Sequence, residues 1–263
     1  MVNAENKVTH SYWAMPEECC LAVSVILSTT RWINGYDLAM CSHFQAFKDR
    51  ERFQRQFGVV PPPDLGKADM WPGYVGSFIR SHPLANVGDA AVPQREALNG
   101  LFGLVPPWSP DTNITRYTYN ARSETVAAKP SFREAWKKAQ HCIIPAEAFY
   151  EPDWRSGKPI PTRIARADGE PMGIAGLWST WKSPKGEEVH SFTMLTVSAE
   201  HHSLMHLFHK PADEKRMVVI LPAACFDDWL QARPEHSLAL LRHSPAVALQ
   251  AMQATPVNGA LFS

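Results

Sequence analysis

Cysteine is scarce in this chain of 263 residues. The five cysteines are Cys19, Cys20, Cys41, Cys142 and Cys225. So low and odd a number excludes the disulfide frameworks that hold small secreted domains together. It is typical of a reducing compartment, where a single cysteine is either buried or chemically active. We therefore expect a cytoplasmic protein.

An excess charge of one sign is also lacking, because 26 Lys and Arg residues balance 26 Asp and Glu residues. This balance excludes a histone-like polybasic chain and leaves room only for a local basic groove. The hydrophobic share of 45% and the charged share of 20% are those of an ordinary globular protein, so a disordered chain is excluded.

Long hydrophobic runs are absent as well. The longest apolar stretch, Cys19–Leu27, is interrupted only by Ser24 and is far shorter than the roughly 20 residues of a spanning helix. Glu17 and Glu18 precede it, where a signal peptide would carry basic residues. We therefore expect no association with a membrane.

Residues 1–39 differ from the rest of the chain. They carry two basic and four acidic residues and show no helical or strand period. We interpret them as an N-terminal extension and residues 40–263 as a single domain.

The domain is expected to be α+β. Phe44, Phe47, Phe53 and Phe57 recur at helical spacing and predict a helix over 42–56 that ends at Gly58. Two further helices are expected, over 131–139 with a capping box of Ser131 and Glu134, and from Pro222 through Leu230. Short apolar runs predict strands at 142–149, 162–167, 173–178, 191–197 and 217–221. Because 22 prolines argue against a helical bundle, we expect a mixed, barrel-like sheet flanked by helices.

Five short motifs carry candidate chemistry. Taken singly, each has an ordinary explanation, such as a buried cysteine, a packed turn or a solvated polar loop. A carboxylate at the end of a buried strand, as at Glu151, is a candidate for a raised pKa. In chain order the motifs are Met40–Phe44, Phe102–Trp108, Asn120–Thr125, Cys142–Glu151 and His206–His209 followed by Arg216.

Together and in this order, the motifs resemble the SOS response-associated peptidase (SRAP) family of abasic-site processing proteins. Members begin Met-Cys-Gly-Arg-Phe and carry a Trp-Gly-Leu-x-Pro-x-Trp turn and an Asn-Ala-Arg-x-Glu-Thr block. A Pro-Ala-x-Gly-Phe-x-Glu-Trp block and a late His before Arg-Met-Pro follow. The resemblance runs from Met40 to about Val257, and the match over Asn120–Thr125 is complete.

The resemblance implies covalent capture of abasic sites in single-stranded DNA. In the family the initiator methionine is removed, so that the cysteine becomes the N-terminus. Its α-amine attacks the aldehyde of the ring-opened sugar, and the thiol closes the Schiff base into a thiazolidine. An α-amine has a pKa near ~8, so much of it can be neutral and nucleophilic near neutral pH.

The resemblance also assigns roles by position. Cys41 would be the nucleophile, Asn120 would hold the N-terminus or the sugar, and Glu151 and His209 would move protons. On the DNA, Arg122 would clamp a phosphate, Trp108 would stack on a base, and Pro72 would match a proline wedge. Lys129 and Arg133 extend the basic cluster around Arg122. No metal or cofactor is implied, and we expect a monomer.

Several positions depart from the family pattern. Ser42 and His43 replace Gly-Arg, and Pro152 replaces the Trp after the glutamate. Six residues separate His209 from Arg216, where the family has about one, so that the choice between His206 and His209 is open; we favour His209. The residues before Cys41 have three interpretations: a start placed too early, which we favour, a leader that is removed by autoprocessing, or a permanent extension that blocks the amine.

Three alternatives to covalent capture remain. His202, His206 and His209 have a helical ligand spacing that would suit zinc, although no His-Glu-x-x-His motif is present. Cys41, His209 and Asn120 could form a Cys-His peptidase. The basic cluster could instead belong to a non-covalent reader of damaged or modified DNA.

Overall fold

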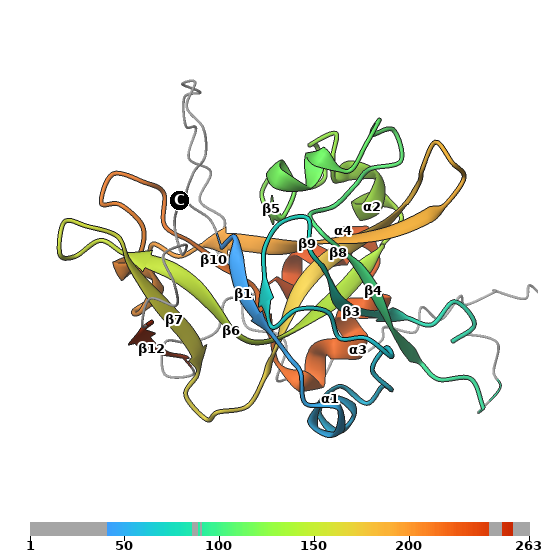
Figure 1. Cartoon of the computed structure of the whole chain (residues 1–263), viewed down its shortest axis with the longest axis horizontal. Helices are drawn as coiled ribbons and strands as arrows, with labels where there is room; N and C mark the ends of the chain where they lie inside the picture. The colour runs from blue at the N-terminus through green and yellow to red at the C-terminus, as the bar shows by residue number, and fades with distance from the viewer. Residues whose placement is uncertain (1–40, 86–88, 90, 242–248, 255–263) are drawn as a thin grey trace, which may run out of the picture. The chain divides into compact units, whose positions relative to one another are not determined.

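The computed structural model describes residues 41–85, 89, 91–241 and 249–254. The expectations for residues 1–39 and for Met40 lie outside the described residues. Figure 1 shows strands that dominate the fold, with short helices packed against them. The elements are β1 (His43–Ala46), α1 (Arg50–Phe57), β2 (Asp69–Met70), β3 (Val75–Ser81), β4 (Arg95–Phe102), η2 (Asn113–Tyr117), β5 (Asn120–Arg122), α2 (Arg133–Lys137), β6 (His141–Asp153), β7 (Ile160–Arg166), β8 (Met172–Lys182), β9 (Glu188–Ser198), η3 (Met205–Leu207), β10 (Arg216–Val218), β11 (Ile220–Leu221), η4 (Ala223–Cys225), α3 (Phe226–Gln231), α4 (Pro234–Leu240) and β12 (Leu249–Gln253).

Five strands close into a barrel in the order β8, β9, β4, β3 and β6, and the pairing of β6 with β8 completes the ring. The β4–β9 pair is parallel, whereas the other four pairs are antiparallel. The expected α+β fold with a mixed, barrel-like sheet is thereby confirmed.

Strand β6 organises the region where the candidate site lies. Its first half pairs with β8 inside the barrel, and its second half runs past the barrel to pair with β7. On its opposite edge, β1 pairs with β6 in a register that sets His43 against Tyr150. Cys41 lies two residues before His43, and Glu151 directly follows Tyr150. The pairing therefore brings together two residues that are 110 positions apart in the sequence.

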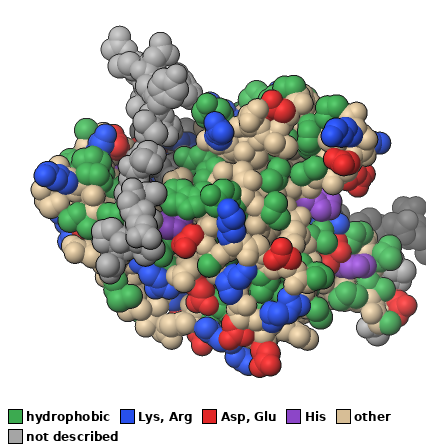
Figure 2. Space-filling model, in the orientation of Figure 1, with side chains coloured by type: hydrophobic (Ala, Val, Ile, Leu, Met, Phe, Trp, Pro, Cys, Tyr) green, Lys and Arg blue, Asp and Glu red, His purple; other side chains and the backbone are tan. Residues whose placement is uncertain are grey.

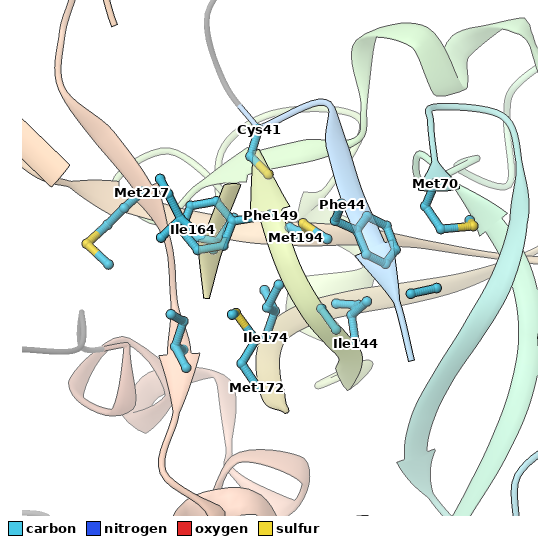
Figure 3. Close-up of a cluster of buried hydrophobic side chains, with 14 of the residues drawn as sticks. Cys41, Phe44, Met70, Ile144, Phe149, Ile164, Met172, Ile174, Met194 and Met217 are labelled. Atoms are coloured by element: carbon cyan, nitrogen blue, oxygen red, sulfur yellow. The ribbon is translucent and has the colours of Figure 1, made fainter. Parts of the chain in front are cut away.

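Hydrophobic side chains alternate between two clusters. Ile144 on β6 joins an inner cluster with Phe44, Met194 and Cys41, which Figure 3 labels. The neighbouring Ile143 joins an outer cluster, which the helices cover through side chains such as Phe57, Trp136 and Trp229. Successive side chains of a strand point to opposite faces, so both faces of β6 are buried.

The helix expected over 42–56 is wrong in its first half. Residues His43–Ala46 form strand β1, in which Phe44 pairs with Phe149 of β6. The helix begins only after Asp49, whose carboxylate accepts from the Arg52 N–H at 2.9 Å. It ends at Gly58 as expected, in the left-handed conformation that glycine favours.

Two smaller expectations also need correction. The helix within 131–139 is present as α2, but its N-cap is Phe132 without a side-chain cap, so the capping box of Ser131 and Glu134 does not form. The strand expected at 217–221 is divided between β10 and β11, which pair with β9 and β8 respectively. Among the described residues, no helix is long and apolar enough to cross a bilayer.

Candidate active site

Cys41 lies in a buried position two residues before β1 and is only 2% exposed. The Asn120 amide donates to the carbonyl oxygen of Cys41 at 3.0 Å. The backbone N–H of Cys41 donates to the carboxylate of Glu151. Both backbone polar groups of this residue are therefore held by side chains that come from distant strands.

Asn120 is held by strand β5, which pairs in parallel with β9 so that Asn120 aligns with Met194. Ala121 is fully buried beside it. The polar sequence suggested a solvated loop, whereas the segment is a short strand of the main sheet. Asn120 Oδ1 is buried and has no hydrogen-bond partner among the described residues, so it can accept from a bound ligand.

Glu151 lies near the end of β6 and is 2% exposed. Burial raises its pKa to about 7, and the nearby His209 and the Cys41 N–H partly oppose that rise. Near neutral pH, both protonation states of this carboxyl group are populated. It can therefore accept or give a proton within the site.

His209 is brought to Glu151 by its backbone. Its N–H donates to the carbonyl oxygen of Pro152, the residue after Glu151, at 3.1 Å. The imidazole Nδ1 then lies 3.6 Å from Glu151 Oε2. Nε2 lies 3.0 Å from the Arg216 carbonyl oxygen, an acceptor, so Nε2 carries a hydrogen, and Nδ1 faces Glu151. His206 is exposed, with its ring against the His202 carbonyl, so the geometry favours His209 for the candidate site.

The thiol of Cys41 is not arranged as in a Cys-His peptidase. Burial, reinforced by the Glu151 carboxylate, raises the pKa of Cys41 well above its usual range. A peptidase cysteine needs the opposite shift, because the thiolate is the nucleophile. The environment of Cys41 therefore argues against the peptidase alternative.

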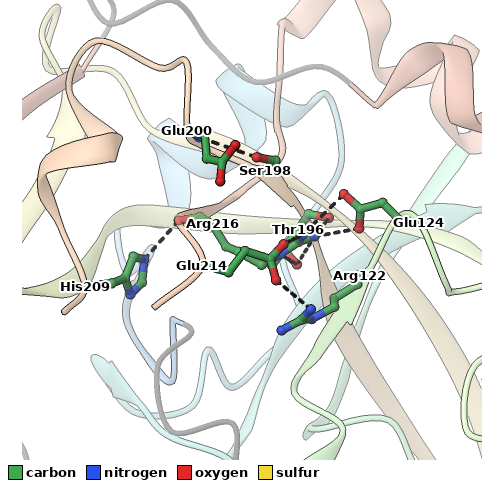
Figure 4. Close-up of polar contacts among 8 residues, drawn as sticks. All are labelled: Arg122, Glu124, Thr196, Ser198, Glu200, His209, Glu214 and Arg216. Carbon is green, nitrogen blue, oxygen red and sulfur yellow. Dashed lines mark hydrogen bonds and ion pairs between the residues drawn. The ribbon is translucent and has the colours of Figure 1, made fainter. Parts of the chain in front are cut away.

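Arg122 belongs to a second polar cluster beside the site, drawn in Figure 4. It forms an ion pair with Glu214 at 2.7 Å. Glu214 also contacts Arg216, whose buried guanidinium binds Glu124 and the carbonyl oxygen of Thr196. Arg122, the side chain expected to clamp phosphate, therefore lies against a carboxylate from residues 210–215. We call this segment between His209 and Arg216 the insertion.

The other expected DNA-binding residues lie on the surface. Trp108 is 55% exposed, and its indole N–H lies 3.4 Å from the carbonyl oxygen of Pro130, which ties it to the turn between Lys129 and Arg133. These three residues therefore share one surface region. On the face shown in Figure 2, basic and acidic side chains are interspersed.

An aromatic stack beside Cys41 was not expected from the sequence. The His43 ring lies between Trp71 and Tyr150, at centroid distances of 4.2 and 4.1 Å and nearly parallel to both. Its Nε2 contacts Asp69 at 3.0 Å. Pro72, the expected wedge, follows Trp71 directly, so the stack adjoins that position. The only sequence signal was the replacement of the family arginine by His43.

The zinc alternative finds no support in the described part of the chain, where no three His, Cys, Asp or Glu side chains are placed to hold a metal. His202 uses its Nδ1 to accept from the backbone N–H groups of Leu204 and Met205. His206 and His209 point to different partners. The spacing of the histidines reflects a short turn.

The chain belongs to the SOS response associated peptidase (SRAP) family, which it matches over residues 40–263. Abasic site processing protein YoqW of Bacillus subtilis (strain 168) is 30% identical over 220 residues, covering 81% of this chain and 92% of YoqW. Abasic site processing protein HMCES of Gallus gallus is 30% identical over 133 residues, covering 42% of this chain and 40% of HMCES. A Bordetella bronchiseptica protein of known crystal structure is 45% identical in sequence to this chain, and the two structures superpose with a TM-score of 0.74. The match covers 82% of this chain and 100% of the Bordetella chain.

Proposed function

We propose that this protein captures abasic sites in single-stranded DNA covalently, through a thiazolidine formed by Cys41 as the N-terminal residue. One observation carries the proposal: the backbone nitrogen of Cys41 donates to the carboxylate of Glu151, a group whose pKa is about 7. When residue 40 is removed, that nitrogen becomes an α-amine next to a proton acceptor. The names of the relatives YoqW and HMCES support abasic DNA as the target.

The chemistry follows in three steps that need no oxidant or reductant. The neutral amine of Cys41 attacks the sugar aldehyde, and Glu151 takes the proton released from nitrogen. The protonated Glu151 gives that proton to the aldehyde oxygen, which becomes a hydroxyl group, and then carries the second nitrogen proton to this hydroxyl group, which leaves as water to give the Schiff base. Finally the thiol sulfur bonds to the same carbon, while the thiol proton passes to the nitrogen. The product is the aldehyde plus the aminothiol minus one water.

The remaining residues hold the reactants. The Asn120 amide fixes the Cys41 carbonyl, and its free Oδ1 suits a sugar hydroxyl group. His209 presents Nδ1 to Glu151 and exchanges protons with it. Arg122 leaves Glu214 to bind a phosphate, while Trp108, Lys129 and Arg133 offer an exposed ring and two cations to the strand. Pro72, next to Trp71 of the aromatic stack, would serve as the wedge against the strand.

The state of the N-terminus decides whether the reaction is possible, because any residue before Cys41 converts the amine into an amide. Initiation at Met40 with loss of the methionine, or cleavage of the extension, would expose it. The test compares the full chain, a form that begins at Cys41, and that form with Cys41→Ser. Each is incubated with single-stranded DNA containing an abasic site and analysed on a denaturing gel and by intact mass.

We expect a heat-stable band only for the form with a free Cys41, with a mass one water below the sum of protein and DNA. The full chain gives the band only if its intact mass shows that residues 1–40 have been lost. A shift under native conditions alone would establish a non-covalent reader and contradict capture. Peptide cleavage that persists with an alanine before Cys41 would instead establish a peptidase.

A further inference from the structure

We propose that Lys215 is a positioning residue for His209, whose backbone it holds by gathering three consecutive carbonyl oxygens around one ammonium group. The proposal rests on the proposed function, in which His209 exchanges protons with Glu151. Lys215 lies at the end of the insertion that separates His209 from Arg216.

The contacts of the ammonium group are the first argument. Lys215 Nζ donates to the carbonyl oxygens of Phe208, His209 and Lys210 at 2.9, 3.1 and 2.7 Å. An ammonium group has three N–H donors, so these three acceptors use all of them. Three successive carbonyls point to one centre only when the chain between them curves, and the cation therefore fixes that curve.

The backbone of His209 requires such a support. Its φ of 65° lies in the left-handed region, which a residue with a Cβ rarely adopts. A conformation of this kind persists where the surroundings impose it. On one side the His209 N–H is bound to the Pro152 carbonyl, and on the other the His209 carbonyl is bound to Lys215. The imidazole is thus aimed at Glu151 by a residue whose two backbone groups are both held.

Packing does not replace the ammonium group on this side of the loop. His209 and Lys215 line a hollow of about 240 Å³ together with Trp154, Arg155 and Pro211. The ammonium bond to the Lys210 carbonyl is exposed, and the bonds to the Phe208 and His209 carbonyls are partly buried. Removal of the cation therefore leaves the loop free to relax, and the imidazole can turn from Glu151.

Lys210 provides a matched control. It belongs to the same insertion and carries the same charge, but its ammonium lies over the Trp154 ring at 5.0 Å from the centroid. Lys210→Met therefore removes one cation from the insertion without removing a donor from the carbonyls. Lys215→Met keeps the length of the stem and loses all three donors, whereas Lys215→Arg keeps the charge and part of the donor set.

The experiment uses the form that begins at Cys41. The Bordetella protein supports the use of a shortened form, because its whole chain matches only 82% of this one. Two quantities are measured for each variant: the rate of crosslinking at saturating abasic DNA, and the Kd for undamaged single-stranded DNA. We expect Lys215→Met to slow crosslinking by about tenfold to a hundredfold, with the Kd changed less than about threefold. Lys215→Arg should recover part of the rate, and Lys210→Met should stay within about twofold of the parent.

A second measurement keeps the test independent of activity. Nitrogen chemical shifts of the His209 ring in the full chain should show the Nε2–H form in the parent and a mixture in Lys215→Met. Equal rates for Lys215→Met and Lys210→Met, or a parallel loss of rate and affinity, would overturn the positioning role. If the parent itself forms no crosslink, the proposed function fails, and the ring shifts alone decide the role of Lys215.

Discussion

At the scale of single residues, burial determines the chemistry of Glu151. A carboxyl group taken out of water favours its neutral form, and each unit of pKa shift corresponds to about 1.4 kcal/mol. The pKa of Glu151 is raised from 4.5 to about 7. The folded state therefore holds a proton that the unfolded state releases between these two values. A carboxylate that can move protons near neutral pH is thus maintained at the expense of stability.

The stability of the protein should reveal this cost. Between pH 4.5 and 7 the folded state binds more protons, so the free energy of unfolding contributed by Glu151 falls as the pH rises and the loss is complete above 7. Glu151→Gln removes the titration and keeps an acceptor for the Cys41 N–H. Urea unfolding should show the variant gaining stability over the parent at pH 8 relative to pH 5. The same difference at both values would contradict the raised pKa.

The same substitution should affect the reaction in the opposite sense. Glu151→Gln cannot take or return a proton, so crosslinking by the form with a free Cys41 should slow by about 10²–10⁴-fold. The rate of the parent should show a transition near pH 7 that the variant lacks. Timed samples on a denaturing gel, over a series of pH values, provide the measurement. A transition that persists in the variant would assign it to another group.

At the scale of elements, the insertion between His209 and β10 connects two parts of the candidate site. Lys215 binds the carbonyls around His209, and Glu214 reaches across to Arg122. Under the proposed function, a phosphate that approaches Arg122 would compete with this carboxylate. Under that function, the insertion would therefore compete with DNA for one cation while it supports the imidazole that exchanges protons with Glu151.

Glu214→Gln should strengthen the binding of single-stranded DNA. The Arg122–Glu214 pair is partly exposed, and pairs of this kind contribute up to about 1 kcal/mol, which corresponds to about fivefold in Kd. Fluorescence anisotropy with undamaged DNA at low salt provides the measurement. Asp213→Asn is the control, since it removes one negative charge from the adjacent position, where Asp213 interacts with Lys215. Equal gains for both variants would indicate an effect of net charge alone.

At the scale of the whole barrel, closure depends on a glycine. Gly176 on β8 faces Cys142 of β6 and Met194 of β9 in the two neighbouring ladders. A Cβ at this position would lie 2.4 Å from the Thr193 carbonyl oxygen and 2.3 Å from the Ile144 side chain. The strands come this close only because residue 176 has no side chain.

Gly176→Ala should therefore lower the free energy of unfolding by about 1–3 kcal/mol, because the backbone of β9 must move. Gly76→Ala is the matched control on β3. Its Cβ would meet the terminal methyl group of Met70 at 2.6 Å, and a flexible side-chain end can move away. Chemical denaturation of both variants should show the larger loss for Gly176→Ala. Equal losses would mean that β8 and β9 adapt as readily as Met70.

The sequence predicted the fold where local pattern and final environment agree. Strands β6, β8 and β9 are apolar runs buried in the barrel, and the ranges predicted from those runs fall within the observed strands. The helix expected over 42–56 failed because Phe44 pairs with Phe149 of β6, a contact 105 residues away that local spacing does not contain. Strands β3 and β4 were missed because their polar and glycine positions interrupt the alternation.

The candidate site was anticipated through family resemblance rather than through pattern. The spacing of Asn120–Thr125 alone favoured a solvated loop, and only the matched block singled out Asn120. The contacts of Lys215, Glu214 and His43 could not be foreseen, since each joins side chains whose proximity is created by the folded sheet and the insertion. The long spacing between His209 and Arg216 indicates where the contacts of Lys215 and Glu214 arise, but it does not identify their partners.

The burial of Cys41 has a consequence for selectivity among aldehydes. An N-terminal cysteine in free solution condenses with any small aldehyde that it meets. Here the residue is 2% exposed and lies among the side chains of the inner cluster. Under the proposed function, and with the same burial in the form that begins at Cys41, a small diffusing aldehyde would meet no aminothiol on the surface, whereas an abasic sugar would be held at the site by its own DNA strand. The fold would therefore protect the Cys41 aminothiol, which can react only once, from aldehydes other than those of abasic DNA.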